Sequence, residues 1–317
     1  VSVSGENFTD RVQETRRLAM DFENGVNVIL ISPRRMGKTS LVKKVQAQVN
    51  QDRIRVIYLD IYDCRSEYDF YNKFATTILK ETSGKMELFL DSVRQFLTRL
   101  SPKISFSPDP NMDYYVSLGI TPKDYSPEEI LNLPEQIGAK MNTHIVVCID
   151  EFQQVRNYPE GRVEALLRSY IQFLPNVRFI FAGSAMHMMS EMFVTPRGAF
   201  YNSTDILSLD VIDRNVYKSF AKKFFEDDEL SFSEESFQYL YDCFSGVTWY
   251  IQAVMNRIWQ TGNGLQSNKD IDSAVDTLIG NSNLVFMDLF RSQSDASMAV
   301  LKAVAKSGCV YMPTGKK

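Results

Sequence analysis

The sequence predicts an α/β fold, built on a parallel sheet and followed by an all-helical region. Short runs rich in β-branched and aliphatic residues are typical of buried parallel strands, and they cover residues 26–31, 55–61, 144–149 and 178–182. Amphipathic helical stretches, first at 41–49 and 66–80, alternate with these runs, and this alternation predicts the parallel sheet. From about Asp213 only helical patterns occur, at 214–225, 233–244, 248–260 and 271–279. This change predicts a domain boundary.

The composition is that of an ordinary globular protein. A length of 317 residues suggests two or three packed units, at roughly 100–200 residues each. Hydrophobic residues make up 44% and charged residues 23%, which excludes wholesale disorder. The net charge of −4 argues against a surface that binds nucleic acid throughout, although a local basic patch stays open.

Targeting and cysteine patterns point to the cytoplasm. The first residues lack the basic and apolar regions of a signal peptide, and the apolar runs are far shorter than the roughly 18–20 residues of a membrane span. The four cysteines and two histidines show no zinc or redox spacing. We therefore expect a cytoplasmic protein that has no membrane partner.

Residues 84–143 interrupt the alternation, and we interpret them as an insertion. A helix is expected over 86–100, and two short apolar runs at 104–106 and 114–118 predict a small hairpin laid on the main sheet. Ser126 is the expected N-cap of a further helix, with a proline and two glutamates in its first turn.

The residues after the first strand match a phosphate-binding pattern. Ser32 to Thr39 fits G-x-x-x-x-G-K-[ST] except that Ser32 replaces the first glycine. A strand ends before this loop and a helix begins at its far end, so backbone N–H groups and the helix dipole converge on an anion. Gly37 leaves room for phosphate, Lys38 supplies charge to the β- and γ-phosphates, and Thr39 offers a hydroxyl oxygen to Mg²⁺. The predicted cofactor-binding residues are Ser32, Pro33, Arg34, Arg35, Met36, Gly37, Lys38, Thr39 and Ser40.

Two further strands end in polar residues that complete this constellation. Asp150 and Glu151 directly follow a fully apolar strand, and so they are expected at the carboxyl edge of the sheet, where ligands bind. Asp150 is the predicted second Mg²⁺ ligand, and Glu151 is placed to polarise a water that attacks the γ-phosphate. Ser184 ends the next strand; orienting that water and simply capping the strand are nearly even interpretations. The predicted catalytic residues are Glu151, Lys38 and Ser184, and the predicted metal ligands are Thr39 and Asp150.

Four strings of residues carry a resemblance to a known family. They are residues 31–41, 149–153, 181–184 and 246–252. Together they resemble the archaeal-type P-loop ATPase family of the AAA+-related signal-transduction ATPases with numerous domains, the STAND group, over about 8–311. The resemblance implies a P-loop NTPase sheet that binds ATP and Mg²⁺, a helical lid and a C-terminal winged helix, with ATP exchange or hydrolysis used as a switch.

Three positions depart from the family pattern. Ser32 is acceptable in place of glycine if it keeps a negative φ. The lid's Gly-x-Pro appears as Gly246-Val247-Thr248, and residues 200–203 stand where the family often shows Tyr-Gly-Arg. Arg197, or Arg168 from a neighbouring subunit of a homo-oligomer, are candidates for the missing charge, although a solvated arginine is the simpler interpretation of each. We therefore expect slow hydrolysis.

Three functions remain open on these residues. The first is a switch ATPase that couples ATP binding or hydrolysis to a signalling or regulatory partner. The second is a nucleotide-bound DNA-binding regulator or scaffold with vestigial hydrolysis, which the departures favour. The third, a P-loop kinase, ranks lower because the lid helices lack the arginines that such an enzyme needs over its phosphates.

An aromatic stripe lies on one of the helical stretches. Trp249, Tyr250 and Trp259 share this stretch with Val254, Met255 and Ile258. We interpret the stripe as lid core rather than as a platform on which adenine stacks.

The last helical pattern predicts the start of a third domain. Residues 294–308 form a capped amphipathic helix with Ser294 as N-cap and a stripe of Met298, Leu301, Val304 and Ala305. One helix cannot bury such a stripe alone, so we expect it to pack against the lid or remain mobile. By resemblance, the helix opens a winged helix that continues beyond Lys317 and binds DNA or a protein partner. The expected domains are 1–210 (ATPase), 211–293 (lid) and 294–317 (start of the winged helix).

Overall fold

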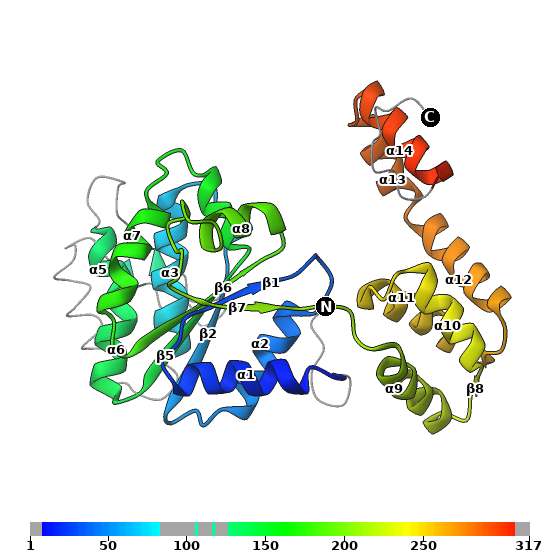
Figure 1. Cartoon of the computed structure of the whole chain (residues 1–317), viewed down its shortest axis with the longest axis horizontal. Coiled ribbons are helices and arrows are strands. Elements are labelled where there is room, and N and C mark those ends of the chain that lie inside the picture. The colour runs from blue at the N-terminus through cyan, green and yellow to red at the C-terminus, as the bar shows by residue number, and fades with distance from the viewer. Residues whose placement is uncertain (1–7, 83–104, 107–115, 118–125, 308–317) are drawn as a thin grey trace. The chain divides into compact units, whose positions relative to one another are not determined.

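Five strands form the central sheet, and four of them are largely buried. The computed structural model describes residues 8–82, 105–106, 116–117 and 126–307. The strands are β1 (Val28–Ile31), β2 (Ile54–Asp60), β5 (His144–Asp150), β6 (Val177–Gly183) and β7 (Asp205–Ser208). They pair in parallel in the order β2-β5-β6-β1-β7, which confirms the predicted sheet (Figure 1). The first strand therefore lies inside the sheet, with β6 on one side and β7 on the other.

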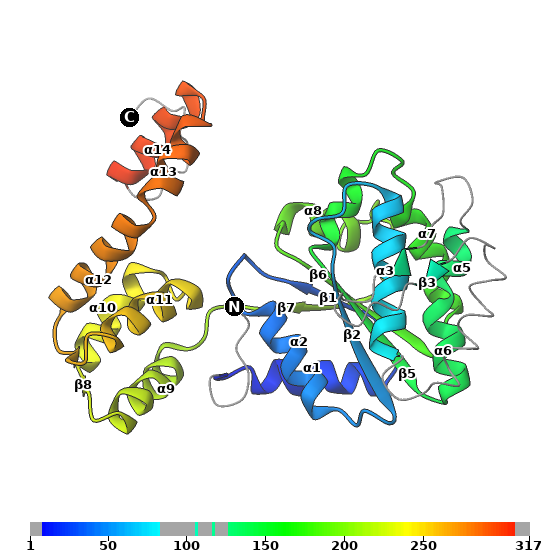
Figure 2. The same cartoon turned by 180° about the vertical axis from the view of Figure 1, so that it is seen from behind.

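Helices cover both faces of this sheet, because alternate strand residues point to opposite sides. Val28 and Leu30 of β1 pack in one hydrophobic cluster, and Ile29 and Ile31 pack in the other. On the first face lie α1 (Val12–Glu23) and α2 (Lys38–Gln48). On the second face lie α3 (Glu67–Thr82), α5 (Pro127–Leu131), α6 (Leu133–Met141), α7 (Val163–Tyr170) and α8 (Met186–Phe193), as Figures 1 and 2 show. The result is a three-layer α/β/α unit, Val1–Val216.

The segment expected as an insertion is described only in part. Ser105–Phe106 (β3) and Val116–Ser117 (β4) pair antiparallel in a two-stranded sheet of their own, which confirms the strand pair of the predicted hairpin. The helix expected over 86–100 lies outside the described residues. The Ser126 hydroxyl accepts the Glu129 N–H at 3.4 Å, so the predicted N-cap is confirmed.

The second unit, Tyr217–Lys317, is helical as predicted. Its helices are α9 (Arg214–Asp227), which leads into it, α10 (Glu234–Cys243), α11 (Thr248–Trp259), α12 (Asn268–Asn281), α13 (Asn283–Arg291) and α14 (Asp295–Ser307). The structure adds a short parallel pair that the sequence did not predict, β8 (Ser231–Phe232) with β9 (Gly264–Leu265). Tyr217, Phe237, Ile251 and Ile271 are among the buried residues that hold α9 to α12 together.

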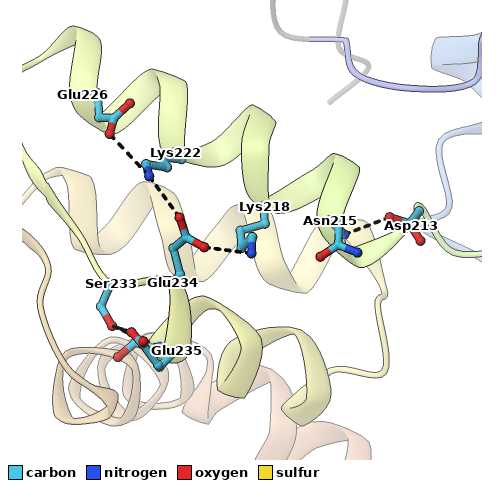
Figure 3. Close-up of polar contacts among 9 residues, drawn as sticks. Asp213, Asn215, Lys218, Lys222, Glu226, Ser233, Glu234 and Glu235 are labelled. Carbon is cyan, nitrogen blue, oxygen red and sulfur yellow. Dashed lines mark hydrogen bonds and ion pairs between the residues drawn. The ribbon is translucent and has the colours of Figure 1, made fainter.

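An ion-pair network joins the first two helices of this unit. Glu234, in the first turn of α10, contacts Lys218 at 2.8 Å and Lys222 at 2.9 Å, both on α9 (Figure 3). Lys222 also contacts Glu226, at 3.8 Å. The carboxylate therefore lies between two lysines at the positive end of its own helix.

The interpretation of the aromatic stripe on α11 is wrong. Trp249, Tyr250 and Trp259 are 43%, 38% and 44% exposed, whereas Ile251, Val254, Met255 and Ile258 are buried. These four buried residues follow the spacing i, i+3, i+4, i+7 and by themselves complete the inward face. The aromatic residues fall outside that face, and the indole Nε1–H of Trp259 instead donates to Asp228 Oδ2 at 2.7 Å.

The last described helices expose apolar side chains. Ser294 caps α14 as predicted, because its Oγ accepts the Ser297 N–H at 3.2 Å. Leu301 and Val304 of the predicted stripe are 46% and 42% exposed. Residues 308–317 lie outside the described range, so the continuation and the domain limits 211–293 and 294–317 stay predictions. No described helix is long and apolar enough to cross a membrane.

Candidate functional site

Three neighbouring strands bring the predicted residues to one edge of the sheet. The loop from Ser32 follows β1, Ser184 follows β6, and Asp150 and Glu151 lie at the end of β5. Because these strands are parallel and adjacent in the order β5-β6-β1, their carboxyl ends lie side by side. The predicted site therefore lies at the carboxyl edge of the sheet, within the first unit.

The phosphate-binding loop has positive φ at two of its residues, and this is strained only at Arg35. Within the loop, φ is positive at Arg35 (69°) and Gly37 (91°), whereas Ser32 keeps the negative φ that its side chain requires. No protein atom lies within 4 Å of a Cβ built on Gly37, so within the protein itself glycine is favoured there by the backbone conformation. Positive φ thus occurs at Arg35 and Gly37 and not at Ser32, the position where the motif has glycine and this chain has serine.

The loop presents exposed and buried residues in turn. Pro33, Arg34, Arg35 and Gly37 are exposed, whereas Ser32, Met36, Lys38 and Ser40 are buried. Met36 and Ser40 anchor the two sides of the loop in the protein interior, and the exposed residues form its rim. An anion would meet this rim and the N-terminus of α2.

Lys38 is folded onto its own loop. Its Nζ donates to the carbonyl oxygens of Ser32 at 3.2 Å and Pro33 at 3.5 Å. Burial lowers the pKa of Lys38 below the ordinary lysine value, and the nearby Asp150 and Glu151 carboxylates only partly offset this effect. A phosphate beside this ammonium would add a further negative charge that favours its protonated form.

Asp150 and Thr39 are brought into contact. Thr39 Oγ1 donates to Asp150 Oδ2 at 3.2 Å, and the Glu151 N–H donates to Asp150 Oδ1 at 2.9 Å. A third group, the Tyr58 hydroxyl of β2, also donates to Asp150 Oδ2. Burial, with Asp150 beside it, raises the pKa of Tyr58 well above its ordinary value, so this hydroxyl stays a donor.

These oxygen donors suit a hard cation such as Mg²⁺ but do not complete its coordination shell. No group of three or more His, Cys, Asp or Glu side chains that could hold a metal occurs in the described part of the chain. Thr39 and Asp150 would thus need phosphate or water oxygens as further ligands. That division between protein and substrate oxygens is typical of Mg²⁺ at nucleotide sites.

Glu151 is held by side chains on two sides. Its carboxylate accepts from Ser184 Oγ at 2.9 Å and also from Gln153 Nε2. Glu151 has φ 56° and ψ 38°, a left-handed conformation that is costly for a residue with a side chain. The next residue, Phe152, is fully buried and contacts the Phe181 ring at 4.6 Å between centroids, which anchors the strained turn.

Glycine and arginine complete the surroundings of Glu151. A Cβ on Gly183 would lie 2.5 Å from Gln153 Oε1, so glycine at this position lets the Gln153 amide reach Glu151. Arg34 Nε donates to Ser184 Oγ at 3.4 Å and so links the rim of the loop to Ser184. Arg197 is exposed and Arg168 half-buried, and neither is a partner of Glu151 or Ser184 in the described structure.

Three residues near the site were not predicted from the sequence. Tyr58 and Gln153 contact the two carboxylates, as described above. Arg11 is buried, and its guanidinium donates to the carbonyl oxygens of Met36 at 3.4 Å and Asp210 at 2.5 Å. The sequence did contain a signal for Tyr58. It lies on the same face of β2 as the inward-facing Ile54 and Val56, and a residue with a polar hydroxyl is unusual at such a core position.

The sequence as a whole matches a described family. Residues 8–254 fit the family described as "ATPase domain predominantly from Archaea". The chain belongs to this family of ATPases. With the loop and sheet edge described above, it is a P-loop ATPase and an ATP hydrolase, as the sequence predicted. No curated protein matches the sequence.

Solved structures share the fold of this archaeal-type ATPase. The Walker-type ATPase of Pyrococcus abyssi aligns with TM-score 0.67 and 19% identity, over 96% of this chain and 82% of that one. The Aeropyrum pernix ORC2 protein, in ADPNP and ADP complexes, aligns with TM-score 0.57 and 15% identity, over 96% and 77%. The ORC1 protein of the same organism, in complex with DNA, aligns with TM-score 0.57 and 13% identity, over 96% and 74%. At these identities the likeness concerns the fold alone.

Proposed function

We propose that this ATPase is Mg²⁺-dependent and uses ATP binding and hydrolysis as a switch that acts on a signalling or regulatory partner. The observation that carries the proposal is the contact between Thr39, at the start of α2, and Asp150, at the end of β5, with Glu151 beside them. A hydroxyl and a carboxylate in contact, next to a lysine in the phosphate-binding loop, are what a Mg²⁺-nucleotide requires of its protein.

Each residue has a separate role in this proposal. The loop from Ser32 to Ser40 surrounds the phosphates with N–H groups, and Lys38 leaves its carbonyl partners to contact the β- and γ-phosphates. Thr39 and Asp150 hold the Mg²⁺, which would neutralise the charge that develops on the phosphates. Glu151 polarises the attacking water, and Ser184 sets the orientation of the Glu151 carboxylate.

Slow hydrolysis is part of the proposal. The Glu151 carboxylate already accepts hydrogen bonds from Ser184 and Gln153, and these donors compete with an attacking water for its oxygen atoms. A slow turnover suits a switch, because the ATP-bound state then persists long enough to be read by a partner.

The partner is proposed to be a protein or DNA, reached through a winged helix that begins at α14. The ORC1 structure, which shares the fold, was solved with DNA, and this favours DNA as a second candidate. If DNA is the partner, the affinity for DNA should fall steeply with salt concentration. If the partner is a protein, the chain should have no measurable affinity for DNA. A homo-oligomer would allow Arg168 of one subunit to act on the next. The free cysteines Cys64, Cys148 and Cys243 suit the cytoplasm that we propose as the setting.

The test of this function is ATP binding and phosphate release with and without Mg²⁺. Lys38→Ala should weaken ATP binding about tenfold to a hundredfold, because a charge-assisted contact is worth about 1.5–3 kcal/mol. Lys43→Ala, which removes an exposed lysine of the same helix, is the matched control and should bind ATP normally. Equal affinity of the Lys38→Ala variant and the natural protein in calorimetry would refute the phosphate-binding role of the loop.

A further inference from the structure

Tyr58 lies where the two proposed Mg²⁺ ligands meet. Its hydroxyl oxygen is 3.1 Å from Thr39 Oγ1, and it donates to Asp150 Oδ2, which also accepts from Thr39 at 3.2 Å. The three oxygen atoms therefore lie within hydrogen-bond distance of one another, and the two hydroxyl protons can make two of the three possible hydrogen bonds at a time. The side chains come from three separate elements, β2, α2 and the end of β5.

Strand register explains why these elements converge. Tyr58 pairs with Cys148 across β2 and β5, and Asp150, two residues farther along, projects to the same face as Cys148. That face carries α2, whose first turn holds Thr39. A tyrosine at position 58 is thus long enough to reach the end of β5 and the start of α2 together.

Packing alone does not call for the hydroxyl. Ile54 and Val56, on the same face of β2, are buried, whereas Tyr58 is half-buried and packs against the edge of that cluster. Phenylalanine would fill the same space without a hydroxyl. The oxygen of Tyr58 is therefore explained by its two polar neighbours rather than by the core.

The Tyr58 hydroxyl offers the Thr39 proton a second acceptor beside Asp150. A threonine that binds a cation directs a lone pair of Oγ1 at the metal, so its proton needs an acceptor elsewhere. The Tyr58 oxygen can accept that proton while its own O–H donates to Asp150. The relay from Thr39 to Tyr58 to Asp150 leaves the Thr39 lone pairs free and fixes the rotation of the Asp150 carboxylate.

We propose that Tyr58 is a positioning residue for Mg²⁺, which holds Thr39 and Asp150 in the arrangement that binds the cation. This inference rests on the proposed Mg²⁺-dependent function. Partners that orient metal ligands in this way typically contribute about tenfold to a hundredfold in metal affinity. Tyr58 touches neither phosphate nor water in this role and acts only through the two ligands.

The decisive variant is Tyr58→Phe in the full chain. The complex with a non-hydrolysable ATP analogue is titrated with Mg²⁺ in a calorimeter, and analogue binding is measured separately in EDTA. We expect the Mg²⁺ concentration for half-saturation to rise about tenfold, with analogue affinity in EDTA unchanged. Tyr158→Phe, which alters a buried tyrosine outside the site, is the matched control and should leave Mg²⁺ binding as it is.

A second variant separates positioning from a general structural effect. If Tyr58 acts through Asp150, the double variant Tyr58→Phe with Asp150→Asn should bind Mg²⁺ no more weakly than Asp150→Asn alone. Additive losses would show that Tyr58 does not work through Asp150. Thermal unfolding of each variant establishes that it is folded before the titration.

The outcomes distinguish this inference from the proposed function. Unchanged or tighter Mg²⁺ binding by Tyr58→Phe overturns the positioning role, and tighter binding would mean that the tyrosine competes with the cation. Failure of the natural protein to bind the ATP analogue, or to respond to Mg²⁺, would instead overturn the function on which the inference rests.

Discussion

Asp150 and Glu151 are neighbours in the chain, but their carboxylates face different partners. Asp150 faces Thr39 and Tyr58, whereas the left-handed turn at Glu151 directs its carboxylate to Ser184 on the next strand. We predict that Glu151→Gln keeps ATP binding and lowers turnover by about 10²–10⁴, the usual contribution of a general base. Asp150→Asn should in addition weaken the response to Mg²⁺.

Phosphate release and calorimetric ATP binding, measured side by side, check this division. Glu164→Gln is a suitable control, because Glu164 accepts from Arg156 away from the site and should leave turnover unchanged. Equal loss of ATP binding in the Glu151 and Asp150 variants would contradict separate roles.

At the residue level, the sequence predicts the parts of the site that a local pattern determines. Lys38, Thr39 and Asp150 follow directly from a loop motif and a strand end. Tyr58 reaches the site only through the register of β2 on β5, and Gln153 only through the strained turn at Glu151. A short stretch of sequence predicts neither which strand another strand pairs with nor a positive φ at a glutamate.

The segment before α1 connects elements that are distant in the chain. Arg11 has φ 62°, and its buried guanidinium joins the Met36 carbonyl of the phosphate loop to the Asp210 carbonyl beyond β7. We predict that Arg11→Ala lowers the free energy of unfolding by about 1.5–3 kcal/mol, since it leaves buried carbonyl groups without their donor. ATP affinity should fall too, because the loop loses a support.

Urea unfolding and ATP titration of the Arg11→Ala variant test this connection. Arg16→Ala removes an exposed arginine of α1 and should change neither quantity. A stability equal to that of the natural protein would show that the Arg11 contacts are not part of what holds the loop.

The ion pairs between α9 and α10 predict a pH dependence of stability. Hydrogen bonds and charge from Lys218 and Lys222 lower the pKa of Glu234 from 4.5 to about 2. A lowered pKa in the folded state means that the stabilisation is complete above about pH 4.5 and is lost as the pH falls toward 2. Glu234→Gln should therefore unfold at lower urea than the natural protein at pH 7, with the difference closing in acid.

Salt gives a second measurement of the same network, because exposed pairs are screened. The difference in urea midpoint between Glu234→Gln and the natural protein should also shrink in 1 M NaCl, because the Debye length there is only about 3 Å. Glu235→Gln, at the next position and hydrogen-bonded only to Ser233 among its described contacts, is the control. A difference that persists unchanged at low pH would rule out the ion pairs as its cause.

Elements were predictable where burial leaves a periodic pattern. The inner strands β1, β5 and β6 are almost wholly buried and read as apolar runs. The edge strand β2 also has half-buried Arg55 and Tyr58 but extends over 7 residues, whereas β7, at the other edge, has only 4 residues with Ile206 exposed and gives a weak signal. On α11 the pattern was present, but the large aromatic residues lie beside the buried face. Size and hydrophobicity alone suggest that these aromatic residues are buried, but spacing decides which residues point inward.

At the scale of the whole molecule, the candidate site and the natural fluorescent reporters lie in different units. Every residue proposed to hold ATP or Mg²⁺ belongs to Val1–Val216. The chain has two tryptophans, Trp249 and Trp259, and both lie half-exposed on α11 in Tyr217–Lys317. Tryptophan emission therefore reports on the helical unit and not on the phosphate-binding loop itself.

A switch requires that ATP binding in the first unit changes the second. We predict that Mg²⁺ with a non-hydrolysable ATP analogue alters the tryptophan emission, with a midpoint equal to the calorimetric Kd. Lys38→Ala should show no change at the same concentration, and Trp249→Phe and Trp259→Phe assign the signal to one side chain. A ligand shifts a conformational equilibrium only through a difference in its affinity for the two states. Calorimetry could show that the analogue binds while the emission of both tryptophans and the hydrogen exchange of α10 to α12 stay unchanged. The helical unit would then not respond to the nucleotide. That result would contradict the switch and leave a plain ATPase.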